Sequence, residues 1–192
     1  HRYSSAASDV YKRQNLLCIP SSKPFDLFNP DRKSSLKLYI NRVFITDKCD
    51  NLIPAYLRFV KGIVDTQDID LNVSREMLQN NPAVAKISKS LVGKILRELK
   101  KIADKDKAKY IQFWNEFGQV LKEGLYEDLE RKDTLLELAR FSNNENDDLI
   151  SLEDYVNAMD KNQKDIYYIA ADTKSQALSS PHLEGFKSKG IK

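Results

Sequence analysis

NPAVAKISKSLVGKILRELKKIA, residues 81–103, is the stretch that decides the fold. Its apolar residues return every three or four positions between Val84 and Ile102, which places them on one face of a helix. Lysines and an arginine fall on the other face, which we expect to contact water. The stretch therefore predicts a long amphipathic helix, the longest element of the chain.

A second helix is predicted directly afterwards, with apolar and aromatic residues along one side between positions 110 and 121. Gly124 is expected to lie just past its end. Phe113, Trp114 and Phe117 belong to this apolar side. Aromatic residues at helical spacing are core residues more often than not, by about four to one, whereas exposed ones would mark an interaction patch. The solvent exposure of Trp114 separates the two interpretations.

The part of the chain before these helices is predicted to form strands and turns. Residues 16–19 are a short apolar run ended by Pro20, which predicts a strand. Residues 36–41 alternate apolar with polar side chains and predict another strand, which continues through residues 43–45. YLRFVKGIVD, residues 56–65, is β-branched and aromatic and predicts another strand. A short helical turn over residues 54–57 is the alternative for its first part.

Shorter elements are predicted after the second helix. TLLELARF, residues 134–141, is expected to form a third helix, and residues 142–148 a polar loop. Ser151 and Asp154 have the spacing of a capping box that opens a helix. DIYYIAA, residues 165–171, has the composition of a strand, and Ser180 with Pro181 is expected to start a last helix. Such alternation indicates an α/β or α+β fold of two small layered units.

The composition is that of an ordinary soluble globular protein, with 41% hydrophobic and 31% charged residues among 192. The sequence contains no long apolar run and no signal peptide, which argues against a membrane span and against export. A formal net charge of +3 is too small to indicate nucleic-acid binding, and acids dilute the lysine-rich stretch 94–109. Two cysteines and two histidines leave little material for a metal site and fit reduced thiols in a cytosolic protein.

No motif of a self-contained enzyme occurs in the sequence. It has neither a GxxxxGK[ST] nor a GxGxxG loop for a nucleotide, no GxSxG motif, and no isolated pair of carboxylates. The polar cluster that remains is LNVSREMLQNN, residues 71–81. If a helix starts at Ser74, Arg75 and Gln79 share one of its faces, with Asn72 in the turn beside them.

Arginine carries a rigid fork of donors that suits phosphate oxygens, and asparagine and glutamine add neutral donors. Arg75, Asn72 and Gln79 could therefore complete a phosphoryl-transfer site whose nucleotide is held by another domain. The structural alternative is that Arg75 pairs with an acid while Ser74 caps a helix. From spacing alone this alternative is favoured by about three to one, because most surface arginines are structural or solvated.

PAYLRFVKGIVDTQDIDLNVSREMLQNN, residues 54–81, resembles the middle domain of the bacterial ninety-kilodalton heat-shock chaperone family, HSP90. The preceding IPSSKPFDLFNPDRKSSLKLYINRVFIT and the following NPAVAKISKSLVGKILRELKKIA carry the same resemblance. FWNEFGQVLKEGLYED, SLEDYV, IYYIAAD and SPHLEGFKSKG then come in the family's order, so the resemblance covers residues 15–192. It implies a layered α/β (α+β) fold with a larger αβ unit, a small helical linker unit and a smaller αβ unit.

The resemblance also implies a cytoplasmic, ATP-driven, dimeric chaperone that assists unfolded or partly folded client proteins. In the family, the arginine of the N-[VIL]-S-R-E turn reaches the terminal phosphate of ATP, which is bound with Mg²⁺ by the preceding domain. That role is implied for Arg75, and Asn72 and Gln79 match its supporting polar residues. Asp70 departs from the proline that the family has there, which loosens the entry into the loop.

The resemblance further sets expected boundaries. HRYSSAASDVYKRQ, residues 1–14, resembles nothing in the family and is expected to be a foreign or disordered leader. The larger αβ part is expected over residues 15–125 and the smaller over 126–192, with the chain cut at both ends relative to the family's middle domain. On this interpretation the chain carries the arginine without an ATP pocket, and it binds no cofactor or metal and hydrolyses no ATP by itself.

A second hypothesis comes from a different class of function. In it the chain is a non-catalytic module that binds clients or partners, and Arg75 is purely structural. Trp114, Phe113 and Phe117 are then the candidate client contacts, provided that they are exposed.

Overall fold

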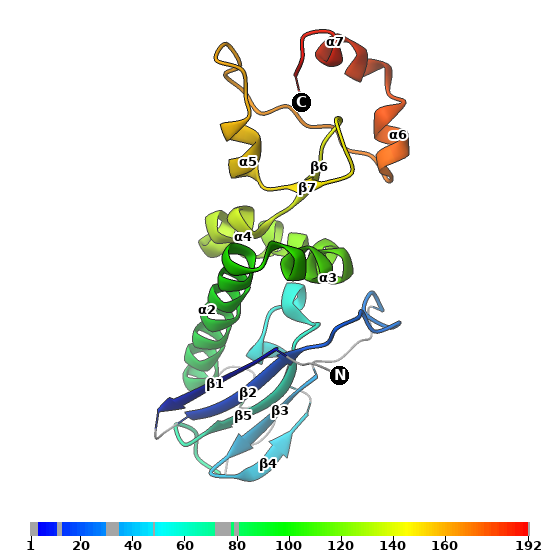
Figure 1. The fold of residues 1–192 in the computed structure, drawn as a ribbon. Coiled ribbons are helices and arrows are strands. Elements are labelled where there is room, and N and C mark those ends of the chain that lie inside the picture. Colours follow the sequence, from blue (N-terminus) through cyan, green and yellow to red (C-terminus); the bar gives the residue numbers. More distant parts are fainter. Residues whose placement is uncertain are drawn as a thin grey trace. The chain divides into compact units, whose positions relative to one another are not determined.

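The computed structural model describes residues 4–10, 13–29, 35–47, 49–71, 78 and 81–191 (Figure 1). The chain forms two compact units, His1–Leu135 and Leu136–Lys192. The division lies later than the predicted boundary at 125/126, because the segment after residue 125 still contacts the first unit: the Tyr56 hydroxyl donates to the Asp128 carboxylate at 2.8 Å. No helix in the described ranges is both long and apolar enough to span a membrane.

A five-stranded sheet forms one layer of the first unit, in the order β1-β2-β5-β3-β4 (Figure 1). Its strands are β1 (Ser4–Val10), β2 (Arg13–Ile19), β3 (Ser35–Ile40), β4 (Val43–Thr46) and β5 (Lys61–Thr66). β3 and β5 run parallel, and the other neighbouring strands are antiparallel. Leu36, Leu38 and Ile40 are fully buried while Lys37 between them is exposed, which confirms the predicted alternation.

The expectation that residues 1–14 form a foreign or disordered leader is wrong for Ser4–Val10. These residues form β1, which pairs antiparallel with β2 from Ser4 opposite Ile19 to Val10 opposite Arg13. A paired strand satisfies the backbone donors and acceptors of the segment, so it belongs to the sheet.

The predicted single strand over residues 36–45 is wrong in one respect, because a hairpin turn divides it into β3 and β4. Asn41 and Arg42 both have positive φ, 50° and 67°, as in the tight two-residue turns that match strand twist. The Asn41 N–H donates to the Thr66 carbonyl at 3.0 Å, and the Arg42 N–H donates to Oδ1 of Asp65 at 3.1 Å. Contacts with the neighbouring strand β5 therefore hold the turn.

The predicted strand over 56–65 is confirmed only in its second part. Its first part follows the alternative: two 3-10 turns, η1 (Asp50–Leu52) and η2 (Ala55–Leu57), precede β5. Tyr56, Leu57 and Phe59 are fully buried there. In a strand, successive side chains point to opposite faces, so Tyr56 and Leu57 could not both face the same core. A helical turn allows both of these neighbouring apolar side chains to be buried.

Two long helices, α2 (Pro82–Lys105) and α3 (Lys107–Glu127), confirm the helical predictions. The Oδ1 of Asn81 accepts from the Ala83 N–H at 2.8 Å, and the Oδ1 of Asp106 accepts from the Lys109 N–H at 3.0 Å, so each helix has a side-chain cap. α2 contacts η1 and α3, and α3 contacts η2. The apolar sides of both helices thus close the core of the first unit.

Gly124 does not end the second helix, contrary to the prediction, but lies inside it. A Cβ on this residue would stand 2.8 Å from Cγ of Tyr56 and 3.0 Å from Cδ1 of Leu135. The missing side chain lets α3 approach η2 and the following helix closely.

Short elements make up the rest of the chain. They are η3 (Leu129–Arg131), α4 (Lys132–Leu138), β6 (Phe141–Ser142), β7 (Leu149–Ile150), α5 (Leu152–Asn157), α6 (Lys174–Leu178), η4 (Pro181–Leu183) and α7 (Glu184–Lys187). The capping box is confirmed, since the Asp154 N–H donates to Ser151 Oγ at 3.0 Å and the Ser151 N–H donates back to Asp154 Oδ2 at 3.2 Å. The third helix and the helix after Ser180 are confirmed as short elements.

The predicted strand over residues 165–171 is wrong. Within the described part of the chain no strand pairs with it, and Ile166, Tyr168 and Ile169 are exposed by 44%, 91% and 40%. Strand propensity reflects packing against a neighbouring strand, so apolar composition alone does not create a strand. Tyr167 instead packs against Phe186, with ring centroids 4.8 Å apart.

Candidate functional site beside the start of helix α2

Asn72, Arg75 and Gln79, the predicted phosphate-contacting residues, lie outside the described residues. The described residues around them fix both ends of the segment. Ile69 and Leu78 are buried, at 3% and 2% exposure, and Asn81 caps α2. The polar segment is therefore anchored in the core on either side.

Helix α2 begins where it does for local reasons. Asn81 has an extended backbone and its side chain accepts a hydrogen bond from the helix, while Pro82 occupies the first helical position and has no N–H to satisfy. The Ala85 N–H donates to the Asn81 carbonyl at 3.2 Å. This cap fixes the start of α2.

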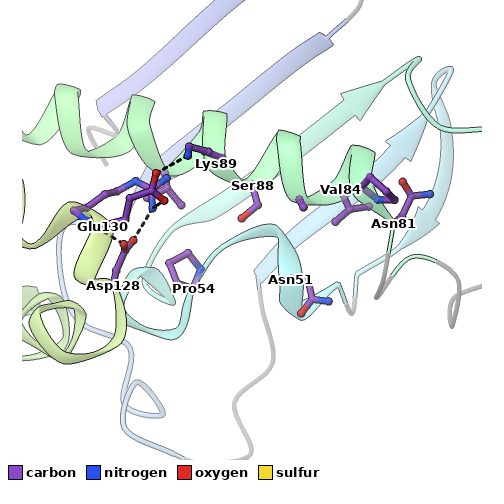
Figure 2. Close-up of a pocket in the computed structure, with 12 residues that line it drawn as sticks. Asn51, Pro54, Asn81, Val84, Ser88, Lys89, Asp128 and Glu130 are labelled. Atoms are coloured by element: carbon purple, nitrogen blue, oxygen red, sulfur yellow. Dashed lines mark hydrogen bonds and ion pairs between the residues drawn. The ribbon is translucent and has the colours of Figure 1, made fainter.

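A groove of about 550 Å³ runs along the first half of α2, beside this cap. Its apolar lining includes Val84 and Val92, which are buried, and Pro54. Figure 2 shows Lys89, Asp128 and Glu130 at one end of the groove and Asn81 at the other. The complete lining is Asn51, Pro54, Asn81, Pro82, Val84, Ala85, Ser88, Lys89, Val92, Asp128, Glu130 and Arg131.

Two ion pairs of different character close the charged end of the groove. Lys89 pairs with Glu130, and these side chains are 67% and 63% exposed. Arg131 donates to Oδ2 of Asp128 at 2.8 Å, and these side chains are only 20% and 13% exposed. The Tyr56 hydroxyl donates to the same carboxylate, so Asp128 is held from two sides. Glu130 also pairs with Arg131, at 3.8 Å between Oε2 and Nη1.

The surroundings of these groups shift their titration. Burial alone would raise the pKa of Asp128, but hydrogen bonds from Tyr56 and Arg131 outweigh it and lower that pKa. Burial and the bond to Asp128 raise the pKa of the Tyr56 hydroxyl above its usual range. The hydrogen bond and the charge of Lys89 lower the pKa of Glu130. Both carboxylates are therefore ionised at neutral pH.

The chemistry of the groove is that of binding. Lys89 and Arg131 balance Asp128 and Glu130, so these four side chains carry no net charge. A lining of apolar residues with a few polar groups is the usual composition of a ligand site.

The groove is not predicted by any local pattern of the sequence. Of its charged residues only Asp128 and Arg131 carry a local signal, since their three-residue spacing lets the aspartate accept from the Arg131 N–H at 3.2 Å. Tyr56 and Lys89 come from separate segments, and nothing in their own neighbourhoods points to the pairing.

The three candidate client contacts on α3 take the positions that the core interpretation predicts. Trp114 and Phe117 are 7% and 1% exposed, and Phe113 is half-buried. Phe59 stacks on Phe117 with centroids 4.8 Å apart and meets Phe113 edge-on at 5.6 Å. A client contact through these rings would need them to become accessible, and it stays a prediction.

Comparison with known proteins agrees with the fold. The sequence profile of the Hsp90 protein family matches residues 5–192, so the match includes most of the expected leader. The chain is 56% identical over 185 residues to the chaperone protein HtpG of Paramagnetospirillum magneticum, covering 96% of this chain and 30% of that protein. It is 53% identical to HtpG of Roseobacter denitrificans, covering 100% of this chain and 31% of the relative.

A solved structure, the middle domain of a putative heat shock protein of Plasmodium falciparum, superimposes with a TM-score of 0.79 at 31% identity. The superposition covers 99% of this chain and 74% of that one. The chain thus spans about a third of the length of its curated relatives and has the fold of an Hsp90 middle domain. A family match over nearly every residue, together with that fold, shows that the chain belongs to the HSP90 family.

Proposed function

We propose that this chain serves as the middle domain of an ATP-driven chaperone and that Arg75 reaches the terminal phosphate of ATP. The observation that carries the proposal is the family match over residues 5–192, which includes the segment with Arg75 directly before α2. The buried Ile69 and Leu78 and the Asn81 cap support it, because they anchor both ends of that segment.

The chemistry of the proposed step is positioning and charge stabilisation. The guanidinium of Arg75 donates to the phosphate oxygens on which negative charge develops, and Asn72 and Gln79 add neutral donors. ATP and Mg²⁺ are held by another domain of the longer protein. The groove beside α2 carries balanced charges and offers no excess positive charge to a triphosphate.

In the complete protein we further propose that the partners are unfolded or partly folded proteins and a second copy of the same chain. The relatives are chaperone proteins by name. A cytoplasmic location fits a chain in which Cys18 and the buried Cys49 form no disulfide.

Replacement of Arg75 by alanine in the complete chaperone tests the catalytic role. We expect ATP turnover to fall by a factor of about 10³, as for other arginines that stabilise a transferring phosphoryl group, while ATP binding persists. Steady-state phosphate release and nucleotide binding by calorimetry measure the two quantities.

The matched control is Arg97→Ala, which removes an exposed arginine from α2. It should leave turnover unchanged. If Arg75→Ala turned over ATP at the rate of the Arg97→Ala variant, Arg75 would be structural.

A further inference from the structure

Thr66 is the last residue of β5, and the chain leads from it to the segment that carries Arg75. β5 lies between β2 and β3 in the sheet (Figure 1), and Thr66 is paired with Arg13 on one side and with Ile40 on the other. The Thr66 carbonyl also accepts from the Asn41 N–H at 3.0 Å. The backbone of Thr66 is therefore fixed from both sides, at the end of a central strand.

The side chain of Thr66 holds the turn that follows the strand. Its Oγ1 accepts from the Asp68 N–H at 3.1 Å, and a threonine hydroxyl that bonds the backbone two residues further on closes a turn. Thr66 is only 1% exposed. A buried hydroxyl needs a hydrogen-bond partner, and for Thr66 the backbone of this turn is such a partner.

The turn directs the next apolar residue back into the core. Gln67 and Asp68 are exposed, whereas Ile69 is 3% exposed. Thr66 and Ile69 are thus two buried residues three positions apart, joined by a turn that the Thr66 hydroxyl closes. They form the entry anchor of the arginine segment.

The exit of the arginine segment has an anchor of its own. Leu78 is 2% exposed and follows Arg75 by three residues, and Asn81 then caps α2. Arg75 therefore lies in sequence between two anchors, with Ile69 six residues before it and Leu78 three residues after it.

We propose that Thr66 is a positioning residue for Arg75, because its hydroxyl holds the turn through which the chain enters the arginine segment. The inference rests on the proposed function, since it concerns the phosphate contact of Arg75. Loss of the hydroxyl leaves the strand end and Leu78 in place but removes the partner of the Asp68 N–H, so the turn gains other conformations. Catalysis by a positioned group is sensitive to displacements of about 1 Å.

Thr66→Val in the complete chaperone tests the inference, because it removes the hydroxyl and keeps the branched shape of the side chain. We expect kcat for ATP to fall about tenfold, since a displacement of about 1 Å can cost 10²-fold and Leu78 still anchors the exit. Nucleotide affinity measured by calorimetry should stay constant, because another domain holds the nucleotide. Thr66→Ser keeps the hydroxyl and should restore at least half of the turnover.

Thr46→Val is the matched control. Thr46 is the last residue of β4 and is also 1% exposed, so this variant likewise removes a buried hydroxyl from the end of a strand. It should leave turnover unchanged. Thermal unfolding identifies a temperature at which both variants are folded, and turnover is compared there.

A double-mutant cycle shows whether Thr66 acts through Arg75. Thr66→Val combined with Arg75→Ala should turn over ATP no more slowly than Arg75→Ala alone, because the residue to be positioned is gone. A further tenfold loss in the double variant, equal turnover of Thr66→Val and Thr46→Val, or no recovery in Thr66→Ser would each overturn the inference.

These outcomes differ from a failure of the catalytic proposal. If Arg75→Ala itself kept full turnover, the proposed role of Arg75 would be wrong. If Arg75→Ala turned over slowly while Thr66→Val matched its control, only the positioning role of Thr66 would be wrong.

Discussion

At the scale of single residues, Arg58 joins three segments of the first unit. Its Nε donates to the Leu27 carbonyl at 2.8 Å and its Nη1 to the Ala55 carbonyl at 3.0 Å. Its guanidinium also makes a two-pronged pair with Glu123 of α3, with Nη2 to Oε1 at 2.8 Å. The Arg58 side chain thus links the turn around Leu27, the 3-10 turn η2 and helix α3.

Arg58→Ala should lower the free energy of unfolding by about 2 kcal/mol. The side chains of the pair are 19% and 37% exposed, so the loss is smaller than the 3–5 kcal/mol roughly expected for a fully buried pair. Arg58→Lys should recover less than half, because one ammonium cannot reproduce the fork. Urea unfolding measures both, with Arg97→Ala as the exposed control, and a loss equal to that of the control would show the contacts to be unimportant.

The carboxylate of Asp128 makes stability depend on pH in a defined direction. Its pKa in the folded protein is lower than its ordinary value of about 4, because Tyr56 and Arg131 stabilise the ionised form. The unfolded chain therefore takes up the proton first as the pH falls. The stabilisation is complete above the unfolded-state pKa and is lost as the pH falls through the folded-state pKa.

Melting temperatures measured between pH 6 and pH 2 should accordingly fall less steeply for Asp128→Asn than for the unmodified chain. Tyr56→Phe should lie between them, since it removes one of the two donors to the carboxylate. If the melting temperatures of all three proteins fell with pH at the same slope, Tyr56 and Arg131 would not stabilise the ionised form of Asp128.

At the scale of elements, two glycines inside the long helices have opposite surroundings. A Cβ on Gly124 would press against Tyr56 at 2.8 Å, whereas a Cβ on Gly93 of α2 would meet only the flexible end of Arg97 at 3.9 Å. Both positions are helical, so their intrinsic preference for alanine is the same.

Gly93→Ala should therefore raise the free energy of unfolding by about 0.5–1 kcal/mol, and Gly124→Ala should lower it by about 1–3 kcal/mol. Thermal or urea unfolding of the two variants measures the contrast. If Gly124→Ala raised the free energy of unfolding instead, α3 and η2 would be able to move apart without destabilising the protein.

Elements with a strong internal pattern could be predicted from the sequence, and those that depend on distant partners could not. The 3.6-residue repeat from Val84 to Ile102 predicts α2, and the alternation around Leu38 predicts β3. The turn at Asn41–Arg42 is missed because apolar residues flank it on both sides, neither turn residue is a glycine, and the contacts that hold it come from β5. The groove is missed for the same reason, since Lys89 and Glu130 lie 41 residues apart.

At the scale of the whole molecule, the two compact units differ in how much core they contain. Among the described residues of Leu136–Lys192 only Leu138, Ala139 and Tyr155 are buried, whereas the first unit buries the apolar sides of two long helices and one face of its sheet. Local stability follows buried apolar contact, so the second unit should open more readily.

Amide hydrogen exchange tests this difference directly. The Tyr155 N–H, which donates to the Ser151 carbonyl at 3.1 Å, and the amides in the middle of α2 are both helical and hydrogen-bonded. Only the amides of α2 belong to a helix that packs on an extensive core. We therefore expect the Tyr155 amide to exchange at least about 100-fold faster than the Ile95 amide. Exchange rates measured at two pH values confirm that opening is at equilibrium, and equal protection at the two positions would mean that both units unfold as one.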